Sequence, residues 1–121
     1  MKLIKILLLA FLLSGCTSMT YKQINMDEAI EQMSQMTDYV LLDVRTLEEY
    51  NAGHIPGARC YPNEEIDEKI EDVLYNKELT IFVYCRSGNR SKQASEKLVN
   101  LGYKNIIEIG GIIDYKGVIE Y

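Results

Sequence analysis

One segment, residues 80–102, constrains the fold more than any other part of this chain. Residues 80–84 are β-branched and aromatic, which predicts a buried strand. A polar run follows at residues 85–90, and Ser91 then stands where a helix can be capped. The apolar positions of that helix recur at helical spacing: Ala94, Leu98 and Leu101. Gly102 occupies the place where a glycine ends a helix, so the segment predicts a strand, a tight loop and a helix in succession.

The polar run begins with Cys85, at the carboxyl end of the predicted strand. Backbone N–H groups in a tight loop can converge on one anion, and the start of a helix adds partial positive charge. Arg86 and Arg90 add full positive charges, which favour the nucleophilic thiolate form of the cysteine. Gly88 permits backbone angles that other residues resist, and Asn89 tolerates them better than most. The alternative is that Cys85 is only a small buried side chain at the end of a strand.

The rest of the chain alternates between strand-like and helical patterns. Strands are predicted at residues 21–24, 39–42, 59–61, 80–84 and 105–109, and helices after Asn25 and Thr46, at residues 63–75 and from Ser91. A glutamate stands three residues after each of the first two capping residues, as capping boxes require. Several strands are apolar on both faces, as parallel strands covered by helices are. We therefore expect an α/β fold with a central, mostly parallel sheet of about five strands flanked by helices on both faces. Such sheets bind ligands at the carboxyl ends of their strands.

Two finer details are expected from the same patterns. The helix at residues 63–75 is predicted to place four apolar side chains inward: Ile66, Ile70, Val73 and Leu74. The last strand is predicted to end at Ile109, because Gly110 and Gly111 break it. A short helical segment or turn then closes the chain.

The first 15 residues are excluded from this domain. Lys2 and Lys5 form a basic region, and residues 6–13 are an unbroken apolar run, too short to span a bilayer but long enough for the core of a signal peptide. The run ends in Leu-Ser-Gly followed by Cys16, which resembles the lipobox of bacterial lipoproteins. The resemblance implies a signal peptide at residues 1–15 and a lipid on Cys16. It also implies a short tether to residue 23, and a domain at residues 24–121 held to a membrane outside the cytoplasm. The alternatives are a plain secretory signal cut elsewhere, or a short apolar helix of no significance.

The charge of the chain limits its partners. The net charge is −5 over 121 residues, which suit one domain, and it becomes −7 without residues 1–15. An acidic domain argues against nucleic acid or anionic lipid as a binding partner. The basic loop around Cys85 is therefore a local exception.

Three motifs together resemble the rhodanese domain. The first is Leu-Asp-Val-Arg at residues 42–45, followed by Glu49-Tyr50 and by Gly-His-Ile-Pro-Gly-Ala at residues 53–58. The second is the cysteine loop at residues 84–91, and the third is Ile-Gly-Gly-Ile at residues 109–112, with Tyr115 where many members have tryptophan. The resemblance extends from about residue 24 to the end of the chain.

The resemblance implies a sulfurtransferase that uses no cofactor and no metal. Cys85 would take a sulfane sulfur from a small anionic donor such as thiosulfate, sulfite would leave, and the persulfide would pass its sulfur to a thiol, cyanide or a protein cysteine. A low-pKa thiolate suits this exchange. The substrate-binding residues would be those of the loop: Arg86, Ser87, Gly88, Asn89, Arg90 and Ser91. Four further motif residues are expected to give structural support: Asp43, Arg45, Glu49 and His54.

Three other functions compete with this interpretation. Cysteine phosphatases place five residues between the cysteine and an arginine, whereas only four separate Cys85 from Arg90. A non-catalytic rhodanese-like binding module is a second alternative, although such modules often lack the cysteine. A thiol redox protein using Cys85 and Cys60 is the third, and it requires the two Cα atoms to lie within about 7 Å.

Overall fold

The computed structural model describes residues 20–121, and its centre is one parallel sheet of five strands in the order β1-β5-β4-β2-β3. The strands are β1 (Lys22–Gln23), β2 (Val40–Asp43), β3 (Arg59–Cys60), β4 (Thr80–Cys85) and β5 (Asn105–Gly111). Neighbouring strands pair in parallel throughout. The predicted parallel sheet of about five strands is therefore confirmed.

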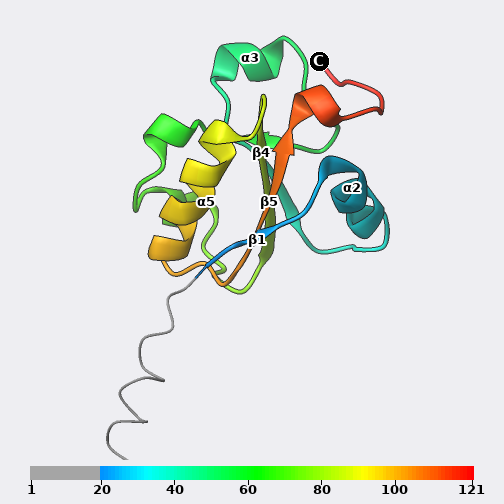
Figure 1. The fold of residues 1–121 in the computed structure, drawn as a ribbon. Coiled ribbons are helices and arrows are strands. Elements are labelled where there is room, and N and C mark those ends of the chain that lie inside the picture. The colour runs from blue at the N-terminus through cyan, green and yellow to red at the C-terminus, as the bar shows by residue number, and fades with distance from the viewer. Residues whose placement is uncertain (1–19) are drawn as a thin grey trace, which may run out of the picture.

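Helices cover both faces of this sheet, with α2 and α5 on opposite sides in Figure 1. The helical elements are α2 (Met26–Ser34), α3 (Leu47–Asn51), η1 (Asn63–Glu65), α4 (Ile70–Val73), α5 (Asn89–Asn100) and η2 (Ile112–Asp114). One core packs α5 and α4 against the sheet, and a second packs α2 against its other face. Phe82 and Val83 are both fully buried because β4 contributes to the two cores in alternation.

The predicted helix starts after Asn25 and Thr46 are correct. The Asn25 side chain accepts the backbone N–H of Glu28 at 2.8 Å. Thr46 and Glu49 form a complete capping box, in which each side chain accepts the other residue's backbone N–H. These bonds satisfy N–H groups that a helix start leaves unpaired.

The predicted helix at residues 63–75 is wrong. The segment holds the single turn η1 and the four-residue α4, because Ile66 is extended and the Asp67 carboxylate accepts the N–H of Lys69 at 2.9 Å. Such local side-chain bonds compete with helical ones. Ile66, Ile70 and Leu74 are buried as expected, whereas Val73 is 48% exposed.

Two predicted boundaries also need correction. Helix α5 begins at Asn89 with Gly88 as its cap, and Ser91 lies inside the first turn with its side chain buried. Strand β5 continues through Gly110 and Gly111 because Gly111 pairs with Cys85. The predicted stop at Gly102 is correct, since this residue has φ +99° after the last turn of α5.

The predicted signal peptide and the lipidation site Cys16 lie outside the described residues. Within residues 20–121, no helix has the length and apolar character needed to cross a bilayer. The membrane tether therefore stays a prediction.

Candidate active site

Cys85 is the last residue of β4, and its side chain sits inside the loop that leads into α5. The residue is 1% exposed. The backbone N–H of Gly88 donates to Cys85 Sγ at 3.0 Å, and Ser91 Oγ lies 3.4 Å from the same sulfur. Gly88 has φ +110°, a conformation that side chains resist, so glycine suits this position of the loop.

The surroundings of the sulfur favour its ionised form. Burial alone raises the pKa of the Cys85 thiol, but hydrogen bonds from the Ser91 hydroxyl and from the backbone N–H groups of Ser91, Gly88 and Ser87 outweigh it. The net result is a pKa below the usual value for a thiol. The thiolate is the nucleophilic form, so the loop prepares Cys85 to attack.

Gly111, the second of the two glycines after Ile109, makes room for this loop. A Cβ on Gly111 would lie 2.0 Å from the carbonyl oxygen of Arg86, so only glycine fits there. Gly110 has φ +87°. The same Arg86 carbonyl accepts the N–H of Ile113 at 3.3 Å, which ties the closing segment to the cysteine loop.

The two loop arginines have different surroundings. Arg86 is exposed and forms no ion pair among the described residues. Arg90 donates to both carboxylate oxygens of Glu49 at 2.6 and 3.0 Å. This pair lowers the pKa of Glu49 to about 2; burial opposes the shift as the second-largest effect, and hydrogen bonds from Thr46 add to the lowering. Arg90 therefore braces α3 against α5, and Arg86 is the loop arginine open to solvent.

A buried network supports the carboxyl ends of the central strands. Asp43, which is fully buried, accepts bonds from the Arg45 guanidinium at 2.7 Å and from the Tyr84 hydroxyl at 2.8 Å. Arg45 also donates to the carbonyl of Gly53 at 2.8 Å. These contacts fit structural support, because the network fixes β2 beside β4 just below Cys85.

The motifs that the sequence suggested therefore meet at one edge of the sheet. Residues 26–116 match the family described as rhodanese-like domain. The chain belongs to the rhodanese-like domain family.

Relatives of this rhodanese-like domain include named sulfurtransferases. The chain is 38% identical over 73 residues to thiosulfate sulfurtransferase PspE of Escherichia coli, covering 60% of this chain and 70% of that protein. It is 32% identical over 108 residues to adenylyltransferase and sulfurtransferase uba4 of Ogataea parapolymorpha, covering 87% of this chain and 28% of that longer protein. These relatives support sulfur transfer as the general activity.

Solved structures agree with this assignment. A rhodanese with anions from E. coli matches with a TM-score of 0.63 at 34% identity, covering 68% of this chain and 96% of that one. The rhodanese-like domain of an Anabaena protein matches with a TM-score of 0.75 at 26% identity, covering 84% of this chain and 80% of that one. The fold of the family is therefore confirmed.

His54 connects the first motif of the rhodanese-like domain to the end of the chain. Its ring nitrogens lie 2.9 Å from the carbonyl of Tyr50 and 3.2 Å from the Glu120 carboxylate, and the ring stacks on Tyr50. The backbones of His54 and Glu120 also exchange two hydrogen bonds. None of these contacts reaches Cys85, so the geometry fits structural support.

The strand register argues against a disulfide between Cys60 and Cys85. Cys60 pairs with Asp43, which pairs in turn with Tyr84, the residue before Cys85. Strand spacing then separates the two cysteines by roughly 10 Å, more than the 7 Å or so that a disulfide allows. Burial, helped by the charge of Asp43, raises the pKa of Cys60 to about 11, which leaves it a poor thiolate.

The sequence patterns did not identify one residue of the site, Glu108 on β5. It is 3% exposed, and its Oε2 accepts the N–H of Gly110 at 2.8 Å and lies 2.5 Å from Ser91 Oγ. An acidic residue within a run of isoleucines was the available signal, because a charge in a buried strand needs a partner.

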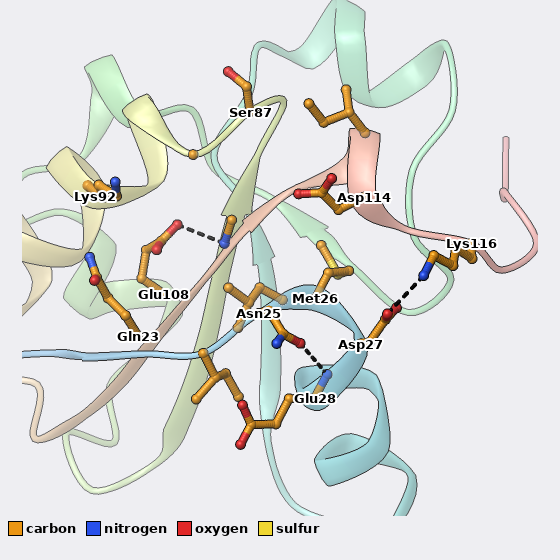
Figure 2. A pocket seen from close by; sticks show the side chains of 15 residues that line it. Gln23, Asn25, Met26, Asp27, Glu28, Ser87, Lys92, Glu108, Asp114 and Lys116 are labelled. Carbon is orange, nitrogen blue, oxygen red and sulfur yellow. Dashed lines mark hydrogen bonds and ion pairs between the residues drawn. The ribbon is translucent and has the colours of Figure 1, made fainter.

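A cavity of about 840 Å³ opens beside the cysteine loop. Its wall includes Ser87 and Gly88 from the loop, Glu108 from β5 and Lys92 from α5, and Figure 2 shows the Glu108 carboxylate hydrogen-bonded to the backbone nitrogen of Gly110. Within residues 20–121, no group of three or more His, Cys, Asp or Glu side chains is placed to hold a metal ion.

Proposed function

We propose that this rhodanese-like domain is a sulfurtransferase that carries sulfane sulfur as a persulfide on Cys85. One observation carries the proposal: the buried Sγ of Cys85 accepts converging N–H groups that lower its pKa. The same groups suit the negative charge of a persulfide, because they are already oriented before the charge arrives.

Loading of the domain is an exchange at sulfur. The Cys85 thiolate attacks the outer sulfur of a donor such as thiosulfate, a new S–S bond forms, and the old one breaks with its electron pair leaving on sulfite. An acceptor thiolate or cyanide then attacks the outer sulfur of the persulfide, and the electron pair returns to Cys85. No oxidant or reductant is consumed.

The donor is attracted by the exposed end of the loop. Thiosulfate is a dianion, and the exposed guanidinium of Arg86 is the loop charge that no carboxylate neutralises among the described residues. Arg90 contributes mainly through the pair with Glu49 that holds the start of α5. The acceptor is a small thiol or the cysteine of another protein.

The intact mass of the purified chain tests the persulfide. We expect thiosulfate to add the mass of one sulfur atom, cyanide to remove it, and Cys85→Ser never to gain it. Cys60→Ser is the matched control, and it should load like the wild type because Cys60 lies two strands away.

Two results would contradict the persulfide proposal. No gain of sulfur by a chain whose Cys85 still reacts with an alkylating agent would indicate a binding module. A loss of two hydrogens, mapped to a bond between Cys60 and Cys85, would indicate a redox protein instead.

We further propose that a lipid on Cys16 tethers the domain to a membrane outside the cytoplasm. The basic start, the apolar run at residues 6–13 and Leu-Ser-Gly before Cys16 support this. In a bacterial host, we expect labelled palmitate to enter the wild type and the chain to sediment with membranes. Cys16→Ser should lose both properties, and a variant that keeps them would refute the tether.

A further inference from the structure

Glu108 is a buried carboxylate without a basic partner among the described residues. It lies 3% exposed on β5, where its Oε2 accepts the Gly110 N–H and approaches Ser91 Oγ to 2.5 Å. No ion pair of residues 20–121 includes it. A buried ionisable group that serves only the fold is costly, so its contact with Ser91 needs an explanation.

The Ser91 hydroxyl connects Glu108 to Cys85. Its oxygen lies 3.4 Å from Cys85 Sγ on one side and 2.5 Å from Glu108 Oε2 on the other. A hydroxyl has one proton to donate and can accept through its lone pairs. If Ser91 donates to the Cys85 thiolate, the short contact with Glu108 needs a proton on Glu108. If Ser91 donates to the Glu108 carboxylate, Cys85 is left to donate its thiol proton to Ser91.

We infer that Glu108 takes the thiol proton of Cys85 through Ser91. In the resting state, Cys85 S–H donates to Ser91 and Ser91 donates to the Glu108 carboxylate. When the thiol ionises, its proton moves to Ser91 Oγ while the Ser91 proton moves to Glu108. An O–H bond forms on Ser91 as the S–H bond of Cys85 breaks. A second O–H bond forms on Glu108 as the original O–H bond of Ser91 breaks, so the negative charge moves from Glu108 to sulfur.

This inference rests on the proposed function, in which the site must hold one negative charge at each stage. During loading, Glu108 keeps the proton while Cys85 carries the thiolate and then the persulfide anion. After the acceptor has taken the sulfur, the proton returns through Ser91 to Cys85. Glu108 is thus a positioning residue, because it acts on the reacting sulfur only through Ser91. Glu108 also lines the cavity shown in Figure 2.

Other charged groups face this site, but none of them replaces Glu108. Five of these groups line the cavity: Lys92 of α5, Asp27 and Glu28 of α2, and Asp114 and Lys116 of the closing segment. The sixth, Arg90, lies near Cys85. None of these six side chains hydrogen-bonds to the Ser91 hydroxyl, whose contacts are Cys85, Glu108 and the carbonyls of Gly88 and Gly110. They therefore do not share the proton of Cys85.

The pH dependence of Cys85 alkylation tests the relay without any sulfur donor. Iodoacetamide is added to the full chain, and the rate is read from the mass of the peptide that contains Cys85. We expect two steps with a plateau between them in the wild type, because the shared proton fixes the thiolate fraction over that pH range. Glu108→Gln keeps the shape and hydrogen bonds of the side chain but takes no proton, so it should show one step without the plateau.

Two further variants separate the relay from general electrostatics. Ser91→Ala removes the bridge and should also give one step. Asp114→Asn removes a carboxylate from the same cavity without touching Ser91, and it should keep both steps. A single step in the wild type, or two steps in Glu108→Gln, would overturn the relay.

A second measurement needs no variant. At the pH of the plateau one proton is shared, so the fraction of the wild type that has the Cys85 thiolate also has a protonated Glu108, and we expect the infrared difference spectrum to show loss of the carboxyl band of that fraction when Cys85 is alkylated. No carboxyl change would overturn the relay. A two-step profile in a chain that never gains sulfur would refute the persulfide and leave the relay standing. Sulfur loading together with a one-step profile would support the persulfide and overturn the relay.

Discussion

Glu49 and Arg90 form a two-point ion pair, at 2.6 and 3.0 Å, although 41 positions separate them in the chain. Glu49 belongs to α3, which follows the first motif, and Arg90 lies in the first turn of α5 beside the cysteine loop. The pair therefore joins two motifs at the carboxyl edge of the sheet. It also explains why an arginine of the cysteine loop is turned toward the protein.

Glu49→Gln should make the unfolding free energy of the domain less dependent on pH in the acid range. The pKa of Glu49 falls from 4.5 to about 2 in the folded chain, mainly through Arg90, so the unfolded state binds more protons in that range. In the wild type, the stabilisation is present above about pH 4.5 and is lost as the pH falls to about 2. We expect Glu49→Gln to cost about 1–2 kcal/mol of unfolding free energy at neutral pH and to flatten this acid slope.

Urea unfolding between pH 2 and pH 7 measures this effect, because this range includes the interval from about 4.5 to about 2 over which the stabilisation is lost. Glu48→Gln is the matched control, because Glu48 is an exposed neighbour in the first turn of α3 and forms no ion pair among the described residues. An equal change of slope in both variants would mean that the Arg90 pair is not the cause.

Arg86→Ala should weaken the use of thiosulfate chiefly through KM. Arg86 is exposed at the loop and attracts the dianion before reaction, so its loss removes binding that the ground state and transition state share. We expect KM to rise roughly tenfold, equivalent to about 1.4 kcal/mol, with a smaller change in kcat. Steady-state kinetics at low ionic strength measure the effect, since salt screens exposed charges.

Lys104→Ala is the control for Arg86→Ala. Lys104 is an exposed base that pairs with Glu78 and directly precedes β5. It therefore lies at the amino-terminal ends of the strands, whereas Cys85 lies at their carboxyl ends. It should leave KM unchanged. A similar rise of KM in both variants, or a fall of kcat alone in Arg86→Ala, would contradict donor attraction by Arg86.

Gly111→Ala should displace the cysteine loop. Its new Cβ would lie 2.0 Å from the Arg86 carbonyl oxygen, and backbone must move to relieve that contact. We expect a loss of about 1–3 kcal/mol of stability together with at least a tenfold slower gain of sulfur. Thermal unfolding and intact mass after thiosulfate measure the two effects.

Gly57→Ala provides the comparison for Gly111→Ala. Gly57 has φ +85° but open space around it, so alanine should cost about 1 kcal/mol through backbone strain alone. Its rate of sulfur gain should stay that of the wild type. A normal rate in Gly111→Ala, despite its lower stability, would show that the close approach does not control the loop.

The error at residues 63–75 shows where periodicity is insufficient. Ile66, Ile70 and Leu74 recur at helical spacing and are buried, yet α4 covers only Ile70–Val73, and the backbone between Ile66 and Ile70 is not helical. Asn63 and Lys97 make contacts that hold this segment against α5. A pattern of burial reports which side chains face a core, and different backbone paths can satisfy the same pattern.

The missed role of Glu108 has a different cause. Ser91 was expected to cap α5, and Glu108 was expected to lie in a plain buried strand. Because α5 begins at Asn89, with Gly88 as its cap, the Ser91 side chain turns inward and contacts Glu108 on β5. Only packing of α5 on β5 brings these two residues, 17 positions apart, into contact.

The sequence by itself determined the alternation of strands and helices, the parallel sheet and the place of Cys85 at the end of β4. These features follow from local periodicity, capping residues and glycines, which act over a few neighbouring residues. The tertiary structure alone decided that Arg90 pairs with Glu49, that Cys60 lies two strands from Cys85, and that Glu108 reaches Ser91. Those contacts join distant segments, and their geometry depends on strand order and on the packing of α3 and α5, which local patterns do not specify.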